Sequence, residues 1–177
     1  MEESEESRVV ERCREGDLTA YRWIYERYEK PLLRTAYRLL GSPQEAEDAV
    51  QESFLKLYRG IGGFRRGASF STYFFRILIN TCTDIRRKRR RKDYQDMEMD
   101  RLPAASRENS GLPLGRIIDR LPERMKACFI LNAVEEFTLR EVADTLQINV
   151  GTVKANVHRA RKKLRTWLTT ETAEVES

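Results

Sequence analysis

The sequence has few of the residues from which metal sites and disulfide frameworks are built. It contains one histidine and three cysteines in 177 residues. Cys13, Cys82 and Cys128 lie far apart, and no CxxC pair occurs. A zinc site or a disulfide framework is therefore not expected, and the cysteines are interpreted as small core or surface residues. The sequence predicts no metal, no cofactor and no catalytic residue.

Long apolar runs are also missing. No stretch reaches the roughly 20 apolar residues that a membrane-spanning helix needs. The first residues, MEESEES, have neither the basic nor the apolar part of a signal peptide. We therefore expect a cytoplasmic protein without membrane insertion. Glycine and proline number only nine and five, and 34% of the residues are charged, which favours a helical, hydrophilic protein over a sheet protein.

Positive charge is distributed unevenly along the chain. The net charge of +5 is modest, but residues 86–92 are seven consecutive Lys or Arg, and residues 150–170 contain no acidic side chain. Both ends and the middle of the chain are acidic. Clustered positive charge between acidic segments predicts a polyanionic partner bound at defined places, and this favours nucleic acid.

Residues 138–165 carry the most specific local pattern. Thr138 and Glu141 form a capping box, and Gln147 to Asn149 make a three-residue turn before a second helix. One face of that helix is apolar, through Val153, Val157, Ala160 and Leu164. The other face is basic, through Lys154, His158, Arg159, Arg161, Lys162 and Arg165. This layout predicts a helix-turn-helix whose second helix enters the major groove, although a basic run taken alone is more often a solvated surface.

The first half of the chain predicts a bundle of helices. They are expected over residues 8–15, from a cap at Asp17, from Pro31 to Gly41, and from a cap at Ser42 to about residue 58. An aromatic stripe in the second helix is interpreted as core; it contains Leu18, Tyr21, Ile24, Tyr25 and Tyr28. The acidic face of the helix after Ser42 is either an ordinary wet face or a docking surface for a basic partner.

A glycine-rich loop and a long basic helix follow. Residues 60–71 hold four glycines, two arginines and two phenylalanines, a composition able to hold a flipped base by stacking; the alternative is that the aromatics anchor the loop to the core. Residues 72–92 form one expected helix. Seven consecutive cations cover every side of it, which predicts phosphate contact.

The sequence therefore predicts an all-α protein of two small helical domains joined by a flexible linker. The first domain covers residues 1–92. Residues 93–112 hold five acidic and two basic residues with proline, serine and glycine, and are expected to form an acidic linker. Residues 113–170 form the second domain, with helices over 113–120 and 122–135 packed under the helix-turn-helix. Residues 171–177 are an acidic tail.

Four segments together resemble a known family, the bacterial extracytoplasmic-function sigma factors of the sigma-70 family. They are AEDAVQESFLKLY (46–58), FSTYFFRILINTCTDIRRKRRR (70–91), LPERMKACFIL (121–131) and VGTVKANVHRARKKL (150–164). The resemblance implies a factor that binds core RNA polymerase, recognises the −35 and −10 promoter elements and promotes promoter opening. The first domain corresponds to sigma region 2 and the second to sigma region 4.

The resemblance also implies roles for individual residues. Binding to the clamp helices of the largest polymerase subunit falls to Asp48, Gln51, Glu52, Phe54 and Leu55. Recognition and melting of the −10 element fall to Phe64, Arg65, Arg66, Ser69, Phe70, Tyr73, Arg76, Asn80 and Arg87. Contact with the −35 element falls to Asn149, Thr152, Lys154, Ala155, His158, Arg159 and Lys162. The implied partners are core polymerase, including its beta flap, promoter DNA and an anti-sigma factor.

Some residues depart from the family pattern. Ala155 and Asn156 replace a common Ser-Arg pair, which removes a hydroxyl and a phosphate-binding charge. Glu136 and Gln147 stand where glycine is frequent, and Tyr73 stands where tryptophan is frequent. Two other functions explain less of the sequence. A stand-alone helix-turn-helix regulator leaves the basic helix and the aromatic loop unexplained, and for an enzyme acting on nucleic acid the sequence offers no ligand cluster or phosphate-binding motif.

Overall fold

The computed structural model describes residues 5–64, 69–98 and 113–175, and within these ranges the fold is all-α, as the sequence predicts. The first half contains α1 (Glu5–Arg14), α2 (Leu18–Leu40), α3 (Pro43–Gly60), a short 3-10 turn (Ile61–Gly63) and α4 (Phe70–Glu98). The second half contains α5 (Pro113–Asp119), α6 (Glu123–Ala133), α7 (Leu139–Leu146) and α8 (Val150–Val175). Arg65, Arg66 and linker residues 99–112 lie outside the described residues.

Helix boundaries in the first half follow local capping chemistry. The Asp17 carboxylate accepts hydrogen bonds from the backbone N–H of Thr19 at 2.8 Å and of Ala20 at 3.4 Å. Hydrogen bonds from Thr19 and Arg12 hold the pKa of the Asp17 carboxyl well below its usual range. Gly41 closes α2 in the left-handed conformation with φ +72°, and the cap at Ser42 is confirmed by its bond from the Glu45 N–H.

Three sequence-based boundaries are wrong. No helix begins at Pro31, because α2 runs through it from Leu18 to Leu40. A buried stripe that includes Ile24, Leu32 and Ala36 continues on both sides of the proline, and its burial outweighs the roughly 3 kcal/mol that an internal proline costs. Helix α4 continues to Glu98, six residues past the expected end, and α8 continues to Val175, so the acidic tail begins as helix.

The core of the first half is aromatic and lies between α2, α3 and α4. Phe74 of α4 is fully buried at its centre. The ring centroids of Phe54, Tyr28 and Phe70 lie 5.0, 5.4 and 5.9 Å from that of Phe74, within the range of favourable aromatic pairs. These contacts fix the relative positions of α3 and α4, and hence of the surfaces they carry.

The second half packs α6 and α7 against the apolar face of α8. The predicted stripe is confirmed, since Val153, Val157, Ala160 and Leu164 are all at most 5% exposed. The capping box of Thr138 and Glu141 is formed. The Asn149 side chain accepts a bond from the Thr152 N–H at 2.7 Å, which starts α8. Burial of this stripe and the two helix caps therefore fix the position of α8 relative to α6 and α7.

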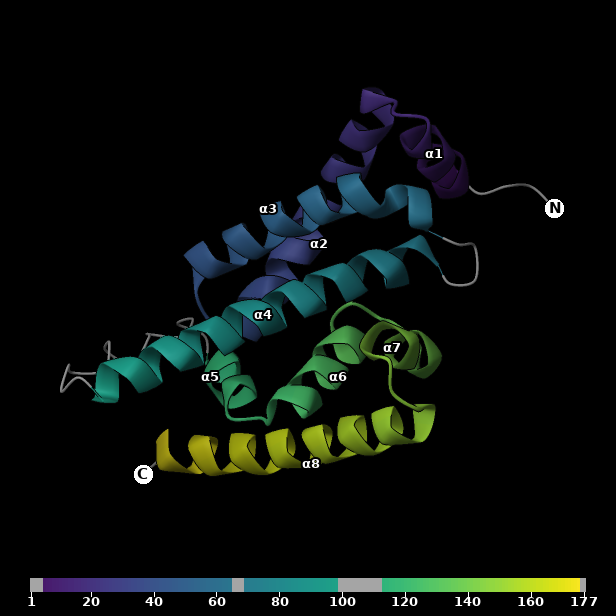
Figure 1. Cartoon of the computed structure of the whole chain (residues 1–177). Helices are drawn as coiled ribbons and strands as arrows, with labels where there is room; N and C mark the ends of the chain where they lie inside the picture. The colour runs from purple at the N-terminus through teal and green to yellow at the C-terminus, as the bar shows by residue number, and fades with distance from the viewer. Residues whose placement is uncertain (1–4, 65–68, 99–112, 176–177) are drawn as a thin grey trace.

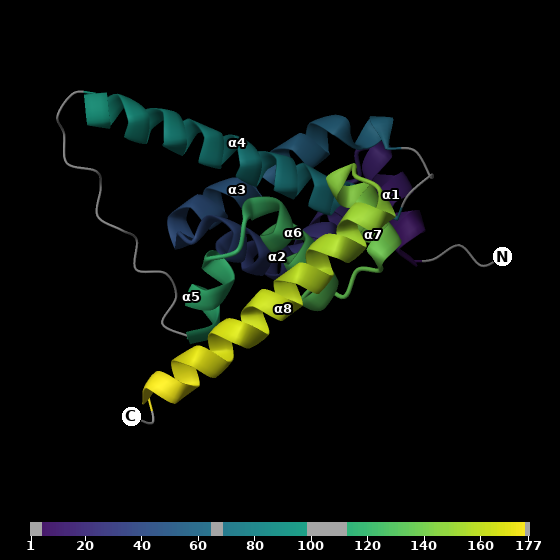
Figure 2. The ribbon, with the colours of Figure 1, turned by 90° about the horizontal axis from the view of Figure 1, so that it is seen from below.

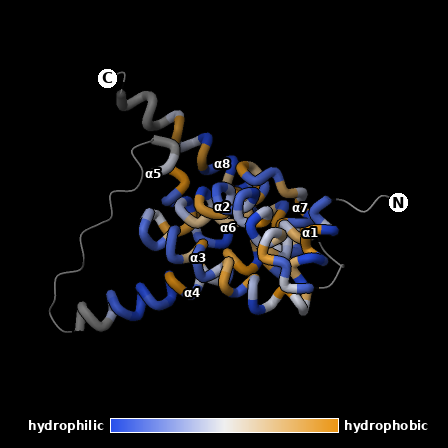
Figure 3. Tube along the Cα trace, turned by 90° about the horizontal axis from the view of Figure 1, so that it is seen from above, coloured by the Kyte–Doolittle hydropathy of each residue, from blue (hydrophilic) through white to orange (hydrophobic). Residues whose placement is uncertain are grey.

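The two halves contact each other in the described structure. Helix α4 lies between α3 on one side and α6 and α7 on the other (Figure 1). Its C-terminal end extends beyond the other helices in Figure 2, and this end is strongly hydrophilic in Figure 3. The basic helix thus has one part enclosed by the chain and one part exposed.

The part of the chain that the structure describes offers no membrane-spanning helix, no metal cluster and no exposed thiol. No helix among the described residues is long and apolar enough to cross a membrane, and no group of three or more His, Cys, Asp or Glu in that part of the chain is able to hold a metal ion. All three cysteines are buried. Burial raises the pKa of Cys82 to about 12 and those of Cys13 and Cys128 to about 11, which keeps these thiols protonated and unreactive.

Candidate functional site

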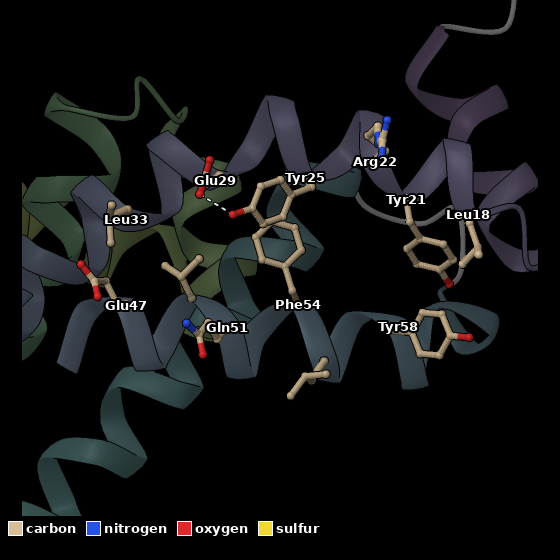
Figure 4. Close-up of a pocket in the computed structure, with 12 residues that line it drawn as sticks. Leu18, Tyr21, Arg22, Tyr25, Glu29, Leu33, Glu47, Gln51, Phe54 and Tyr58 are labelled. Atoms are coloured by element: carbon tan, nitrogen blue, oxygen red, sulfur yellow. Dashed lines mark hydrogen bonds between the residues drawn. The ribbon is translucent and has the colours of Figure 1, made fainter. Parts of the chain in front are cut away.

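An apolar groove of about 670 Å³ separates the outer faces of α2 and α3. Figure 4 shows Tyr21 and Tyr25 of α2 facing Tyr58 and Phe54 of α3 across it. The ring centroids of Tyr21 and Tyr58 and those of Tyr25 and Phe54 both lie 5.0 Å apart. Four large apolar side chains line the groove yet stay exposed: Leu18 at 71%, Tyr58 at 57%, Leu55 at 50% and Tyr25 at 46%. An apolar surface of this kind is typical of a protein-binding site.

The interpretation of the α2 aromatic stripe as core is therefore only partly correct. Ile24 and Tyr28 are buried, but Leu18 and Tyr25 are exposed in the groove. Tyr58, on the facing helix α3, is also exposed. Apolar residues at helical spacing look alike in sequence whether they face a core or a groove. Only the packing of α3 against α2 shows which part of the stripe is left uncovered.

The five residues predicted to bind polymerase divide into two groups. Gln51, Phe54 and Leu55 line the groove. Asp48 is exposed on the same helix, and Glu52 lies 3.9 Å from the Lys56 ammonium. Asp48 and Glu52 thus form an acidic strip on α3, beside the apolar groove between α2 and α3. Of the groove residues, Leu18, Tyr21, Tyr25 and Tyr58 were not predicted as functional.

Phe64 and Ser69, the described residues that flank positions 65–68, contact the first turn of α4. The Phe64 ring lies 4.9 Å from that of Tyr73 and 5.8 Å from that of Phe70. The Tyr73 hydroxyl donates to the carbonyl oxygen of Gly60 at 3.2 Å, and the Ser69 hydroxyl accepts from the Thr72 N–H at 3.2 Å. Phe70 is only 4% exposed, whereas Phe64 and Tyr73 are half-buried. Of these three rings, Phe64 and Tyr73 are the ones that stay partly exposed.

The basic end of α4 is not uniformly available to phosphates. Arg89 donates to the carbonyl oxygen of Leu40 at 3.3 Å and to the Glu45 carboxylate at 3.1 Å. Arg86 forms an ion pair with Glu123 at 2.5 Å. Helix packing turns Arg86 and Arg89 inward, so the phosphate contact predicted for the basic run stays a prediction for its other cations. Arg87 is exposed, with a side-chain accessibility of 65%.

Two other predicted residues of α4 face the second half of the chain. Arg76 donates from Nη2 to the carbonyl oxygen of Asp144, at the end of α7, at 2.7 Å. Asn80 lines a cavity of about 310 Å³ together with residues of α6 and α7. Among the residues predicted to bind the −10 element, Arg76 and Asn80 therefore lie at the contact between the two halves. Phe64 and Tyr73 lie outside this contact.

The basic face of α8 points outward. Lys154, His158, Arg159 and Lys162 are exposed, while Thr152 and Ala155 are half-buried. The Asn156 amide donates to the carbonyl oxygen of Thr152 at 2.9 Å, so it is turned along the helix. Asn149 uses its side-chain oxygen as the helix cap. Three cations and His158 on adjacent turns, with no acidic residue between positions 150 and 170, form a surface suited to a DNA groove.

The turns around α7 have an unusual backbone. Glu136 and Gln147, on either side of that helix, both have positive φ, at 57° and 54°. The sequence identified both as positions where glycine is frequent. The structure keeps the left-handed conformation and accommodates a side chain there, at a cost of about 1–2 kcal/mol per residue.

Comparisons with known proteins match both halves. The family model described as Sigma-70 region 2 matches residues 24–92, and the model described as Sigma-70, region 4 matches residues 112–164. The ECF RNA polymerase sigma factor SigW of Bacillus subtilis is 31% identical over 173 residues, which covers 88% of this chain and 92% of that protein. The RNA polymerase sigma-H factor of Pseudomonas aeruginosa is 29% identical, covering 93% and 94%.

Two solved structures share the fold. CnrH in complex with the cytosolic domain of CnrY has a TM-score of 0.72 at 20% identity, and the match covers 92% of this chain and 96% of that one. The sigma factor RpoE in complex with the anti-sigma factor NepR, from Bartonella quintana, also has a TM-score of 0.72, at 23% identity, covering 84% and 96%.

Proposed function

The chain belongs to the extracytoplasmic-function sigma factors of the sigma-70 family and so functions in transcription initiation. We propose that three of its surfaces bind three different partners. The α2–α3 groove and the acidic strip of α3 bind core RNA polymerase. The loop before α4, with the exposed part of α4, binds the opened −10 element. The basic face of α8 binds the −35 element as duplex.

The observation that carries this proposal is the groove. Most of its lining lies in the segment 24–92 matched by Sigma-70 region 2. The groove exposes four large apolar side chains, and its α3 wall also carries Asp48 and Glu52. Apolar anchors beside charged groups give an interface both affinity and orientation. The groove contains no group of the second half, so a partner is able to reach it directly.

In this proposal the promoter opens because the protein binds melted DNA more tightly than duplex DNA. Contacts of α8 with phosphates supply binding energy, and a few side chains at base edges supply specificity. The half-buried rings of Phe64 and Tyr73 gain stacking energy only from a base that has left the duplex. DNA that is already bound through α8 is thereby shifted toward its melted form. The protein makes and breaks no covalent bond in this scheme.

A protein partner that restrains the factor is also part of the proposal. The two solved structures described above are complexes with a second protein, and in one of them that protein is an anti-sigma factor. An exposed apolar groove that binds polymerase is open to a competitor of similar chemistry. We therefore include an anti-sigma factor among the partners of this chain.

Charge reversal of the acidic strip tests the polymerase assignment. Asp48→Arg with Glu52→Arg is expected to weaken binding to core polymerase at least tenfold, because like charges then meet across the interface. Glu15→Arg with Asp93→Arg makes the same charge change on exposed residues outside the groove and serves as the control. Equal affinity of both variants in a polymerase titration would refute the assignment. Tight duplex binding without any polymerase binding would instead indicate a stand-alone regulator.

The division between base-reading and phosphate-binding residues gives a second prediction. Arg159→Ala is expected to lose about 1–3 kcal/mol of binding at particular base pairs. Arg87→Ala is expected to weaken all sequences similarly and to lower the salt slope by about one unit. Arg89 is unsuitable for this test because it is paired with Glu45. Selection from a randomised duplex pool with the reconstituted holoenzyme measures both effects, and the same sequence preference and salt slope in the two variants would disprove the division.

A further inference from the structure

A cavity of about 400 Å³ is lined by the C-terminal part of α2 together with α5 and the end of α6. Its volume falls toward the small end of the range of small-molecule sites, about 300–1,000 Å³. The cavity shares no lining residue with the α2–α3 groove, and none of its lining residues belongs to α4 or α8. It is therefore separate from the surfaces assigned to polymerase and to DNA.

Most of the cavity wall is apolar. Ile118 of α5 is buried, and Tyr37, Phe129 and Val134 are half-buried. Ala133, the last residue of α6, also lines the cavity and is exposed, so the cavity opens to solvent on this side. An apolar chamber of this size, with an opening and a few polar groups, is typical of a site for a small organic molecule.

Two arginines of α2 supply the positive charge of the cavity wall. Arg34 is already paired, because it donates to the Glu135 carboxylate from Nε at 3.1 Å and from Nη2 at 2.7 Å. Arg38 differs, since its Nη1 is buried and has no hydrogen-bond partner among the described residues. Burial, and then the positive charge of Arg34, lower the pKa of the Arg38 guanidinium. A guanidinium nevertheless stays protonated in proteins, so Nη1 is a buried donor in need of an acceptor.

The carboxylates of this region are already engaged. Glu135 is bound by Arg34, and Asp119, which lines the cavity, accepts a hydrogen bond from the Lys126 ammonium at 2.8 Å. The Lys126 side chain is only 8% exposed. With Arg38 included, three cationic side chains meet two carboxylates, so one positive charge among these five groups is unmatched. One bound negative charge balances it, whereas a dianion brings a further charge close to Asp119 and Glu135.

We propose that this cavity binds a small monocarboxylate with an apolar body. The ligand carboxylate accepts a hydrogen bond from Nη1 of Arg38. The apolar body packs against Tyr37, Ile118 and Phe129, where burial of its surface supplies the rest of the affinity. A charge-assisted hydrogen bond is strong where most water is excluded, so the carboxylate determines which apolar molecules the cavity accepts. This site is independent of the functions proposed for the groove, α4 and α8.

Calorimetric titration of the full chain with octanoate tests the class of ligand. Octanol is the neutral probe of the same chain length. Octanoate is expected to bind at least about tenfold more tightly than octanol, because only the carboxylate offers Arg38 a charged acceptor. Equal affinities for the two probes would overturn the proposal, and so would a dissociation constant for octanoate weaker than about 1 mM.

Arg38→Met tests the residue that selects the carboxylate. This variant is expected to lose the preference for octanoate, with affinity for octanol changed by no more than about twofold. Loss of a buried donor that has no acceptor is not expected to destabilise the chain. Arg59→Met makes the same change at an exposed arginine of α3 that does not line the cavity, and it should keep the preference. Octanoate affinity in Arg38→Met equal to that of this control would overturn the assignment.

Ala133→Trp tests the place of binding. The added ring closes the opening of the cavity and is expected to weaken binding of both probes at least about tenfold. Thr166→Trp adds the same ring at an exposed position of α8, outside the cavity, and serves as the control. Octanoate held in the α2–α3 groove would depend neither on Arg38 nor on Ala133. Binding that both variants leave unchanged would therefore locate the probe in the groove and overturn the proposal.

Discussion

Phe74→Ala is expected to lower the free energy of unfolding of the first domain by about 4 kcal/mol, which is roughly a thousandfold in the folding equilibrium. The ring is fully buried, and the rings of Tyr28, Phe54 and Phe70 surround it. Truncation removes all of these contacts at once and leaves a cavity that three neighbouring aromatic rings cannot easily fill. Chemical denaturation followed by circular dichroism measures the loss.

The control for this substitution is Tyr94→Ala, also on α4. Tyr94 is 67% exposed, so its removal is expected to change stability by no more than about 0.5 kcal/mol. Because the chain has two domains, the denaturation curve is fitted with two transitions, and the loss should appear in one of them. A loss below about 1 kcal/mol in the Phe74 variant would show that the core is not organised around this ring.

Tyr25→Ala with Leu55→Ala is expected to weaken binding to core polymerase about a hundredfold or more. Each side chain projects from one wall of the groove and is about half exposed, at 46% and 50%. Apolar and aromatic anchors that become fully buried on binding typically cost about 2 kcal/mol or more each when truncated. Tyr25 also packs on Phe54 at 5.0 Å and donates to Glu29, so its orientation is fixed before a partner arrives.

The same pair of substitutions should leave the fold nearly intact. Both side chains are largely outside the core, and the expected loss of stability is about 1 kcal/mol or less. Leu168→Ala, an exposed leucine of α8 at 39%, is the matched control for loss of apolar surface. Polymerase affinity that matches this control would contradict the groove assignment even if the acidic strip proved essential.

The elements that the sequence predicted well are those set by local chemistry. The caps at Asp17, Ser42 and Thr138 are confirmed, because a side chain three residues from its backbone partner needs no information from the rest of the fold. The buried stripe of α8 and the turn before it are confirmed for the same reason, since helical periodicity alone decides which face is apolar. The resemblance to the family then assigned the first half to sigma region 2 and the second half to sigma region 4.

The elements that the sequence predicted poorly depend on distant packing. Pro31 ordinarily favours a helix start, and only the buried stripe on both sides of it shows that α2 is continuous. The exposure of Leu18 and Tyr25 depends on how far α3 covers α2. Likewise, a run of seven cations has no periodic pattern from which the pairing of Arg86 with Glu123 or of Arg89 with Glu45 is predictable. Ionic contacts between segments far apart in the sequence require the tertiary structure.

The left-handed backbone of Glu136 and Gln147 makes these two turns attractive sites for protein engineering. Both residues adopt positive φ without being glycine, and glycine at such a position is free of the steric penalty that an L side chain carries. Neither residue is among those assigned to polymerase or DNA. Glycine at these two positions is therefore expected to give a more stable protein, suited to crystallisation or calorimetry, with both binding surfaces unchanged.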